Sequence, residues 1–475
     1  MTSPHETAAL DHVDAQIDAS LDRLIALMRI PSISTDPAHK DDCLRAARSQ
    51  ADELADLGFA ARVAPTQGHP MVVAHHAGPG GDAPHLLFYG HYDVQPADPI
   101  ELWRHGPFDP VIETRDDGSK QVVGRGACDD KGQFRTFIEA FRAILESGGT
   151  LPCRVTVLLE GEEESGSESL EPFLRDNMQE LKADVAMICD TGAWDADTPG
   201  ITTGLRGTAA GQVTIRAADR DLHSGLYGGP ARNPNEVLAR ILGSMKDEDG
   251  RVTLDGFYDG VAPIDSELRA AWDKLGFDGD AFLREVELSV PAGEKGHDVL
   301  EQSWARPTAE INGMWGGYIS EGFKTVIPSE AHAKVSFRLV GDQDPDKVWD
   351  SFKRHVRAHL PADCEASFKP RGGSRAISLA TDSAPLRAAR AALDAEWGKS
   401  ALLASGGSIP VVNSIKAILG MDTVMVGFAL NDDNIHSPNE KYDLKAFYKG
   451  IRSWVRILNA LGQVDTERTE AVAAE

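Results

Sequence analysis

The sequence predicts an α/β protein: a mostly parallel sheet with helices on both faces, interrupted by a smaller α+β part. Two observations lead to this prediction. Early in the chain, continuous apolar runs alternate with segments of helical spacing, as in buried parallel strands joined by crossover helices. Further along, one run alternates strictly between apolar and polar residues, which is typical of a sheet with one solvated face.

The first part of the chain shows the strand and helix alternation in order. A helix is expected over residues 14–29, because apolar residues recur there at helical spacing and Pro31 stops it. A second helix is expected over 134–149, ending at the pair Gly148-Gly149. Buried strands are expected around these helices, at 85–90, 153–161 and 183–190.

From about Thr203 the pattern changes to half-buried strands, and the alternation is clearest from Ala331 to Leu339. The segment 246–305 is rich in Gly and Asp and carries no readable motif. The other expected elements are a strand at 211–218, helices at 233–245 and 345–360, and, where the parallel pattern resumes, a strand at 423–428 and a helix at 446–461. We therefore expect a discontinuous domain, 1–203 and 383–475, interrupted by an inserted domain, 204–382.

The chain of 475 residues is strongly acidic, with 48 Lys+Arg against 74 Asp+Glu and a formal net charge of −26. Such a charge repels nucleic acids and anionic membranes, and no run of Lys or Arg offers a local exception. The longest aliphatic stretches, such as residues 24–28, are far shorter than the roughly 18 apolar residues of a membrane span. We expect neither nucleic acid nor membrane as a partner.

The start of the chain, MTSPHETAALDHVDAQ, has neither a basic nor an apolar segment, so we expect no secretory signal. The cysteines are odd in number and lack CxxC spacing, which argues against a disulfide framework and for a reducing compartment. The expected location is therefore cytoplasmic.

Acidic residues and a histidine cluster where the predicted strands end or a helix begins. These residues are His91, Asp93, Asp129, Asp130, Glu162, Glu163, Glu164 and Asp190. The carboxyl ends of strands in an open α/β sheet are where ligands bind. So many carboxylates in one crevice would repel each other strongly without cations. The pattern therefore predicts a metal site.

Each cluster alone has a plainer explanation. His91 or Asp93 could be a surface-loop residue, and three consecutive glutamates are usually a solvated run of charge. Asp129 could favour the positive end of the next helix, and Asp190 could cap an element. Their common position in the pattern favours the metal site over these separate explanations.

Seven motifs occur in an order that resembles a known family: HYDVQPA (91–97), GRGACDDKG (124–132), EGEEESGSE (160–168), DLHSGLYGG (221–229), KTVIP (324–328), GGSIP (406–410) and HSPNEKY (436–442). The series is similar to that of the two-metal dipeptidases, the carnosinase and cytosolic non-specific dipeptidase branch of the aminoacylase/carboxypeptidase superfamily. The resemblance runs from about residue 20 to residue 460, which is nearly the whole chain.

The resemblance implies two divalent metal ions per subunit, held by His91 and Asp190, by Glu164 and His436, and by Asp129 as the bridge. Ligands that are all nitrogen or oxygen suit Zn²⁺, the expected metal, with Mn²⁺ or Co²⁺ as alternatives. Cys128, which stands where the family often has Ser or Thr, and Cys189 are expected to be small buried residues and not ligands.

The resemblance also implies that Glu163 is the general base toward a metal-bridging hydroxide, and that Asp93 orients His91. The motif register leaves Glu162 at a variable position. His223 would stabilise the oxyanion from the other subunit of a homodimer formed through the inserted, lid-like domain, 204–382. Arg338, Thr325 and Ser408 would hold the substrate. An exposed arginine on a strand and a surface or lid-packing histidine are the plainer alternatives.

The expected function is metal-dependent hydrolysis of dipeptides or short peptides that have a free C-terminal carboxylate. An N-acyl-amino-acid deacylase or a carboxypeptidase-like amidohydrolase shares the same metal motifs and is the first alternative. A catalytically inactive binding protein with the same fold is the alternative from a different class.

Overall fold

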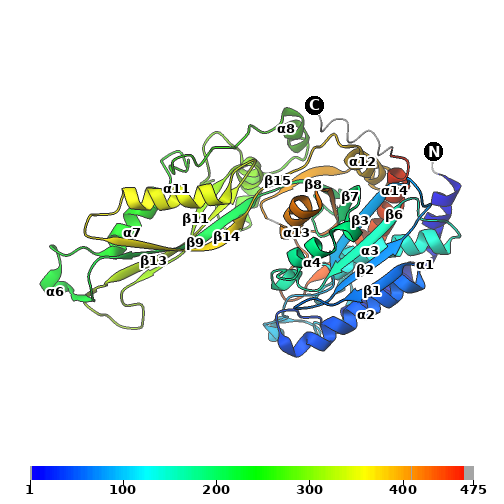
Figure 1. Cartoon of the computed structure of the whole chain (residues 1–475), viewed down its shortest axis with the longest axis horizontal. Coiled ribbons are helices and arrows are strands. Elements are labelled where there is room, and N and C mark those ends of the chain that lie inside the picture. The colour runs from blue at the N-terminus through cyan, green and yellow to red at the C-terminus, as the bar shows by residue number, and fades with distance from the viewer. Residues whose placement is uncertain (1–2, 408, 465–475) are drawn as a thin grey trace. The chain divides into compact units, whose positions relative to one another are not determined.

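A computed structural model describes residues 3–407 and 409–464 and divides the chain into two compact units (Figure 1). The first unit holds the chain up to Thr203, Leu379–Leu403, and the chain from Ser414 onward. The second unit holds Gly204–Ser378 and Ala404–Asn413. The segment 404–413, which the sequence-based division assigns to the first part, is grouped with the second unit.

The main sheet has the strand order β1-β2-β6-β3-β7-β17-β8, and β16 also pairs with β8. The strands are β1 (Ala60–Ala64), β2 (Met71–His76), β3 (His85–His91), β6 (Arg154–Glu160), β7 (Val185–Ile188), β8 (Gly200–Leu205), β16 (Ala401–Ser405) and β17 (Asp422–Gly427). A separate small sheet has the order β18-β5-β4, from Lys441–Asp443, Lys120–Val123 and Val111–Thr114.

The centre of the main sheet is parallel and its flanks are antiparallel. β3 runs parallel to β6 and β7, and β17 runs parallel to β7. β1 and β2 pair antiparallel, as do β2 with β6 and β8 with β17. The predicted α/β class is confirmed, but the sheet is mixed. The short link between β1 and β2 is the reason at that edge, because a parallel pair needs a long crossover.

Helices α1 (Pro4–Met28), α3 (Lys131–Glu146) and α14 (Leu444–Leu461) pack against one another, and α12 (Ala384–Trp397) packs on α14. Helix α2 (Lys40–Asp56) lies along β1 and β2. The shorter helices are α4 (Leu170–Asp176), α5 (Met178–Leu181) and α13 (Pro410–Ser414). Helix α1 begins earlier than the expected residue 14, because the Ser3 side chain accepts a hydrogen bond from the Glu6 N–H.

Aromatic side chains join the sheet to these helices. Phe88 of β3 lies 5.0 Å from the ring of Phe137 and 5.1 Å from the ring of Phe141, both on α3. The same ring lies 5.3 Å from Trp454 of α14. Burial of such large rings dominates the energetics of a core. The strand that carries His91 is therefore firmly held.

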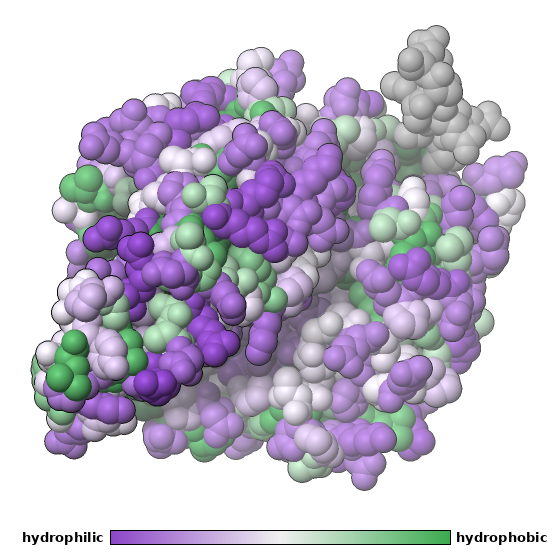
Figure 2. All heavy atoms as spheres, turned by 60° about the vertical axis from the view of Figure 1, so that its left-hand side comes forward, coloured by the Kyte–Doolittle hydropathy of each residue, from purple (hydrophilic) through white to green (hydrophobic). Residues whose placement is uncertain are grey.

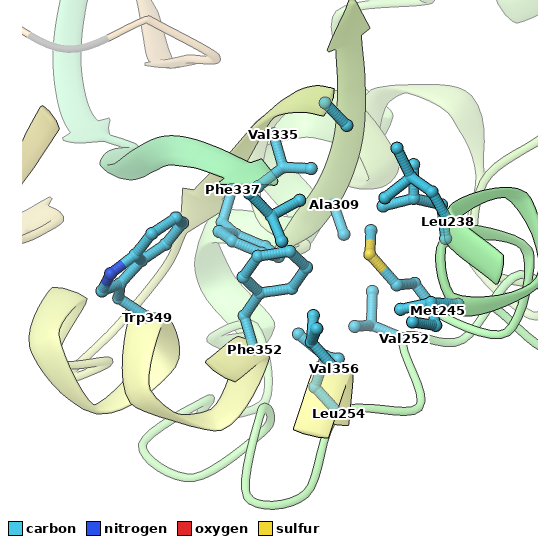
Figure 3. Close-up of a cluster of buried hydrophobic side chains, with 14 of the residues drawn as sticks. Leu238, Met245, Val252, Leu254, Ala309, Val335, Phe337, Trp349, Phe352 and Val356 are labelled. Atoms are coloured by element: carbon cyan, nitrogen blue, oxygen red, sulfur yellow. The ribbon is translucent and has the colours of Figure 1, made fainter. Parts of the chain in front are cut away.

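The second unit is built on an antiparallel sheet of order β11-β13-β9-β14. Its strands are Thr308–Gly316, Glu330–Leu339, Gly207–Arg216 and Glu365–Ser374, in that order, and helices α7 (Pro234–Gly243) and α11 (Pro345–Ala358) pack on them. Phe352 and Trp349 of α11 and Leu238 of α7 meet Val335 and Phe337 of β13 in one buried cluster (Figure 3). The alternation predicted for β13 is confirmed, since its apolar positions are the buried ones.

The rest of the second unit consists of short elements. The segment 246–305 contains α8 (Ser266–Asp273), α9 (Gly279–Arg284) and α10 (Val299–Trp304). Strands β10 (Leu222–His223) and β12 (Val326–Ile327) pair beside α6 (Ser224–Tyr227), and β15 (Ile377–Ser378) pairs with the end of β8.

Within the part of the chain that the structure describes, no helix is long and apolar enough to cross a membrane. On the face drawn in Figure 2, hydrophobic residues form small separate groups among hydrophilic ones. This surface agrees with a share of charged residues, 26% of the chain, that is ordinary for a globular protein.

Candidate metal centre

The side chains expected to bind metal meet in the first unit, in two groups that share Asp129. One group is His91, Asp129 and Asp190, and the other is Asp129, Glu164 and His436. Within each group the potential ligand atoms all lie within 4.8 Å of one another. The Asp129 carboxylate lies between two imidazoles, with Oδ1 3.0 Å from His91 Nε2 and Oδ2 2.9 Å from His436 Nε2.

Strand ends and adjoining turns bring these side chains together. His91 is the last residue of β3, and Asp190 follows the end of β7. Glu164 lies in the short 3₁₀ turn Glu163–Ser165 that follows β6. Because β3 is parallel to both β6 and β7, the carboxyl ends of all three strands lie at the same edge of the sheet.

Asp93 and Gln95, on the loop after β3, support two of these residues. Asp93 Oδ1 lies 3.4 Å from His91 Nδ1, on the side of the ring away from Asp129. Asp93 Oδ2 accepts a hydrogen bond from the Glu164 backbone N–H at 3.0 Å. Gln95 donates to the Glu164 carboxylate at 2.9 Å. Such supporting contacts fix the direction in which a metal ligand points.

Burial and neighbouring charges shift the pKa values of the residues in this cluster. Burial would lower the pKa of His91, but its contacts with Asp129 and Asp93 raise it well above the ordinary value. Hydrogen bonds to Asp129 and Glu164 raise the pKa of His436 to about 10. Burial and the charge of Asp129 raise the pKa of Asp190 well above the ordinary range. Oxygen and imidazole donors gathered around one shared carboxylate fit divalent cations.

The three consecutive glutamates have different surroundings. Glu162 accepts hydrogen bonds from the backbone N–H groups of His69 and Ser169, at 2.9 and 3.0 Å. Glu164 faces His436 at 3.1 Å. Burial raises the pKa of Glu163 to about 7; the His91 charge lowers it, and the Glu164 charge raises it.

Comparison with known proteins places the chain in a family. The profile of Peptidase family M20/M25/M40 matches residues 87–460. The chain belongs to this family. Both the predicted resemblance and the prediction of a peptidase-class enzyme are confirmed.

Individual M20 relatives match over nearly their whole length. The chain is 28% identical to the Cys-Gly metallodipeptidase of Saccharomyces cerevisiae over 95% of this chain and 97% of the relative. It is also 28% identical to the Beta-Ala-His dipeptidase of Rattus norvegicus, over 95% of each chain.

Solved M20 structures are similar over the same extent. A di-peptidase of Saccharomyces cerevisiae is 26% identical, with a TM-score of 0.78 and coverage of 98% of this chain and 100% of that one. An M20 family metallo-carboxypeptidase of Sulfolobus solfataricus is 30% identical, with a TM-score of 0.80 and coverage of 94% and 99%.

The remaining residues expected from the M20 motifs lie in the second unit. His223 on β10 pairs with Val326 of β12, and its Nδ1 accepts a hydrogen bond from the Gly225 N–H at 3.0 Å. Thr325 accepts a backbone hydrogen bond from Ser224 at 3.1 Å, next to His223. Arg338 stands on β13, opposite Thr308 of β11. Ser408 lies outside the described residues.

Gln95 and Glu440 were not predicted from the sequence. They lie inside the motifs HYDVQPA and HSPNEKY, but only contacts in three dimensions show that they support ligands. Asp130, one of the predicted cluster, accepts a hydrogen bond from the His91 N–H at 3.1 Å. Cys128 and Cys189 are fully buried, as predicted, and the Cys128 thiol donates to Asp433 at 3.3 Å.

Proposed function

We propose that this M20 family member is a two-metal dipeptidase, which hydrolyses the amide bond of dipeptides or short peptides that have a free C-terminal carboxylate. The observation that carries this proposal is the pair of ligand groups sharing Asp129. The names of the relatives support it, since two of those that match nearly their full length are dipeptidases.

In this proposal His91 and Asp190 hold one cation, Glu164 and His436 hold the other, and Asp129 bridges them. Bound there, two divalent cations would polarise the substrate carbonyl and lower the pKa of a water molecule. The donor set suits Zn²⁺, with Mn²⁺ or Co²⁺ as alternatives. Asp93 keeps the His91 ring turned toward the site, because it lies against the opposite ring nitrogen.

Glu163 is the proposed general base. Its position next to Glu164 places it beside the ligands, and its raised pKa gives the carboxyl group a proton affinity near neutral pH. The carboxylate would accept a proton from the attacking water and later donate it to the leaving amine. Both transfers use the same carboxyl group, which ends the cycle as it began.

His223 is the proposed oxyanion donor. Its Nδ1 accepts a backbone hydrogen bond, so the neutral ring carries its proton on Nε2, which is then a donor. A donor of this kind can stabilise the negative charge that develops on the carbonyl oxygen.

Arg338, with Thr325 and Ser408, is proposed to bind the substrate carboxylate. Within the described residues, no carboxylate pairs with Arg338. Arg206, whose pKa is lowered to about 10 by burial and by the charge of Arg338, stands near it. A guanidinium group without a carboxylate partner suits the bidentate binding of a substrate carboxylate.

We further propose a homodimer through the second unit. The edge strand β11 and the loop that follows it expose large apolar side chains, namely Ile311, Met314, Tyr318, Ile319 and Phe323. Phe323 is 99% exposed. Exposed apolar groups beside an unpaired strand edge are typical of a protein interface.

The predicted cytoplasmic location stays a prediction. All five cysteines are free and buried, which is compatible with a reducing compartment.

An activity screen tests the proposed function. The protein, purified metal-free and then loaded with Zn²⁺, Mn²⁺ or Co²⁺, is assayed on dipeptides, tripeptides and N-acyl amino acids, with release of free amino acid as the readout. We expect the highest kcat/KM on dipeptides. Preferred turnover of N-acyl amino acids would favour a deacylase. Preferred turnover of longer peptides would favour a carboxypeptidase, the activity named for one of the similar structures. Metal binding without turnover of any substrate would favour the inactive binding protein.

A further inference from the structure

Glu440 is completely buried close to the metal centre but belongs to none of the ligand groups. Its carboxylate accepts hydrogen bonds from the backbone N–H groups of Cys128 and Asp129 on Oε1, at 2.9 and 3.0 Å. Its Oε2 accepts from the Gly126 N–H at 3.0 Å and from Arg125 at 2.8 Å. Every one of these donors belongs to the turn 125–129, which ends at the shared ligand Asp129.

Glu440 itself ends the loop that carries His436. The backbone of this loop is unusual, because Asn434, His436 and Asn439 all have positive φ, at 54°, 61° and 62°. Residues other than glycine adopt this conformation at a cost and keep it only where their surroundings hold them. The His436 loop therefore needs firm attachments.

The attachments lie on both sides of His436. Before it, Asp433 accepts a hydrogen bond from the Cys128 thiol at 3.3 Å. After it, the Asn439 side chain accepts from the Arg104 N–H at 2.8 Å and donates to the Leu102 carbonyl at 2.9 Å. Glu440 follows directly and binds the turn 125–129. The side chain of His436, between these attachments, is left half exposed.

We propose that Glu440 is a positioning residue for the metal centre: it fastens the turn that carries Asp129 to the loop that carries His436. The proposal rests on the metal centre of the proposed function. Asp129 and His436 come from segments far apart in the chain, and their side chains meet only if the two backbones keep a fixed separation. The Glu440 carboxylate provides that link, because one oxygen binds the start of the turn, at Arg125 and Gly126, and the other binds its end, at Cys128 and Asp129. A residue without two acceptor oxygens would leave some of these buried N–H groups without an acceptor.

Co²⁺ titration of the metal-free protein tests this role, followed by the visible absorption of the bound ion. Glu440→Gln keeps the size of the side chain but points an NH₂ group at N–H donors. We expect its affinity for Co²⁺ to fall about 10- to 100-fold, the usual effect of losing a partner that orients a ligand. Excess Co²⁺ should restore much of any hydrolysis, since the defect lies in holding the ions.

Glu139→Gln is the matched control. Glu139 is also a buried carboxylate, but it is paired with Arg23 and Arg135 on the helices of the first unit. We expect this variant to unfold at a lower temperature and to bind Co²⁺ with parental affinity. A folded Glu440→Gln variant with parental Co²⁺ affinity would overturn the proposal, and so would an equal loss of affinity in Glu139→Gln.

A milder variant keeps the test open if Glu440→Gln fails to fold. Glu440→Asp retains the charge on a side chain one methylene shorter, so it reaches fewer of the N–H donors. We expect a Co²⁺ affinity below that of the parent, and parental affinity would overturn the proposal. A parent protein that binds two Co²⁺ ions and hydrolyses no peptide would instead contradict the dipeptidase function, while the comparison of affinities would still decide the role of Glu440.

Discussion

At the scale of single residues, neighbouring side chains of one type perform different tasks because their partners differ. The three glutamates after β6 are the clearest case. Glu162 is occupied by backbone N–H groups of His69 and Ser169, and Glu164 faces His436. Among the described residues, no hydrogen bond engages the side chain of Glu163. A carboxyl group without a fixed partner is free to take up and release a proton.

Glu163→Gln should therefore remove catalysis and keep the metal centre. The amide has nearly the same shape but no basic oxygen, so kcat should fall by about 10²- to 10⁴-fold, the usual contribution of a general base. Bound metal, measured by elemental analysis, should be unchanged. Glu162→Gln is the control: it should lower the stability and leave kcat close to that of the parent. Near-parental turnover by Glu163→Gln would contradict the assignment of the base.

At the scale of elements, a buried ion network joins three helices of the first unit. Arg135 of α3 pairs with Glu53 of α2 and with Glu139 of its own helix. Arg142 of α3 also contacts Glu53, at 2.7 Å, and Arg23 of α1 contacts Glu139 at 2.6 Å. Removing one charge leaves the buried guanidinium groups with fewer carboxylate partners, which is more costly than losing a surface pair.

Glu53→Gln should lower the free energy of unfolding by about 3–5 kcal/mol. The measurement is urea-induced unfolding followed by circular dichroism. Glu146→Gln is the matched control, since Glu146 pairs with Arg142 on the same helix at 2.8 Å but has a side chain 45% exposed. Loss of the Glu146 charge should lower the free energy of unfolding by less than about 1 kcal/mol. Equal effects of the two substitutions would show that burial does not strengthen the network.

The same network predicts how stability depends on pH. Burial would raise the pKa of Glu53, but Arg135 and Arg142 hold it at about 2. A carboxyl group with a lowered pKa in the folded state contributes its stability above the unfolded-state pKa of about 4.3. That contribution is lost as the pH falls from about 5 toward 2. The difference in unfolding free energy between the parent and Glu53→Gln should be constant near neutral pH and shrink below about pH 5. A difference at pH 3 as large as the difference at neutral pH would refute this account.

The spacing of apolar residues predicted most helices and strands. This spacing indicates which faces are buried, but not whether a strand runs parallel or antiparallel to its neighbour. The strand at β3 and the alternation from Ala331 to Leu339 were predictable, because each pattern reflects one or two buried faces. The antiparallel flanks of the main sheet were not, since a buried strand looks alike in either direction. The early start of α1 depends on one hydrogen bond to Ser3, a cap that the apolar spacing does not reveal.

The candidate site could also be predicted only in part from the sequence. His91 and Asp190 could be named because chemical type and strand-end position coincide, and Asp129 because it stands just before a predicted helix. Gln95 and Glu440 could not, because their importance lies in contacts with segments far along the chain.

At the scale of the whole molecule, the metal ions should stabilise the fold. The carboxylates and imidazoles of the centre come together only in the folded chain, so the cations bind the folded state far better than the unfolded one. A free metal concentration of 100 times Kd should add about 2.7 kcal/mol to the free energy of unfolding. Thermal melts should shift upward on adding Zn²⁺ and back on adding a chelator. Asp129→Ala should abolish the shift, and an unchanged shift in that variant would contradict the assignment of Asp129 as the common ligand.

In the proposed homodimer, His223 of one subunit acts on the metal centre of the other. Two inactive variants that lack different parts of this shared site should therefore restore activity when their subunits are mixed. His223→Ala subunits keep their metal ligands, and Asp129→Ala subunits keep His223, so each variant alone should be nearly inactive. Each heterodimer would contain one complete site. Random association at equal amounts gives half heterodimers, so the mixture should recover about one quarter of the parental activity per subunit. Native mass spectrometry would count the heterodimers. If they form and the mixture stays as inactive as its components, His223 acts within its own subunit or not at all.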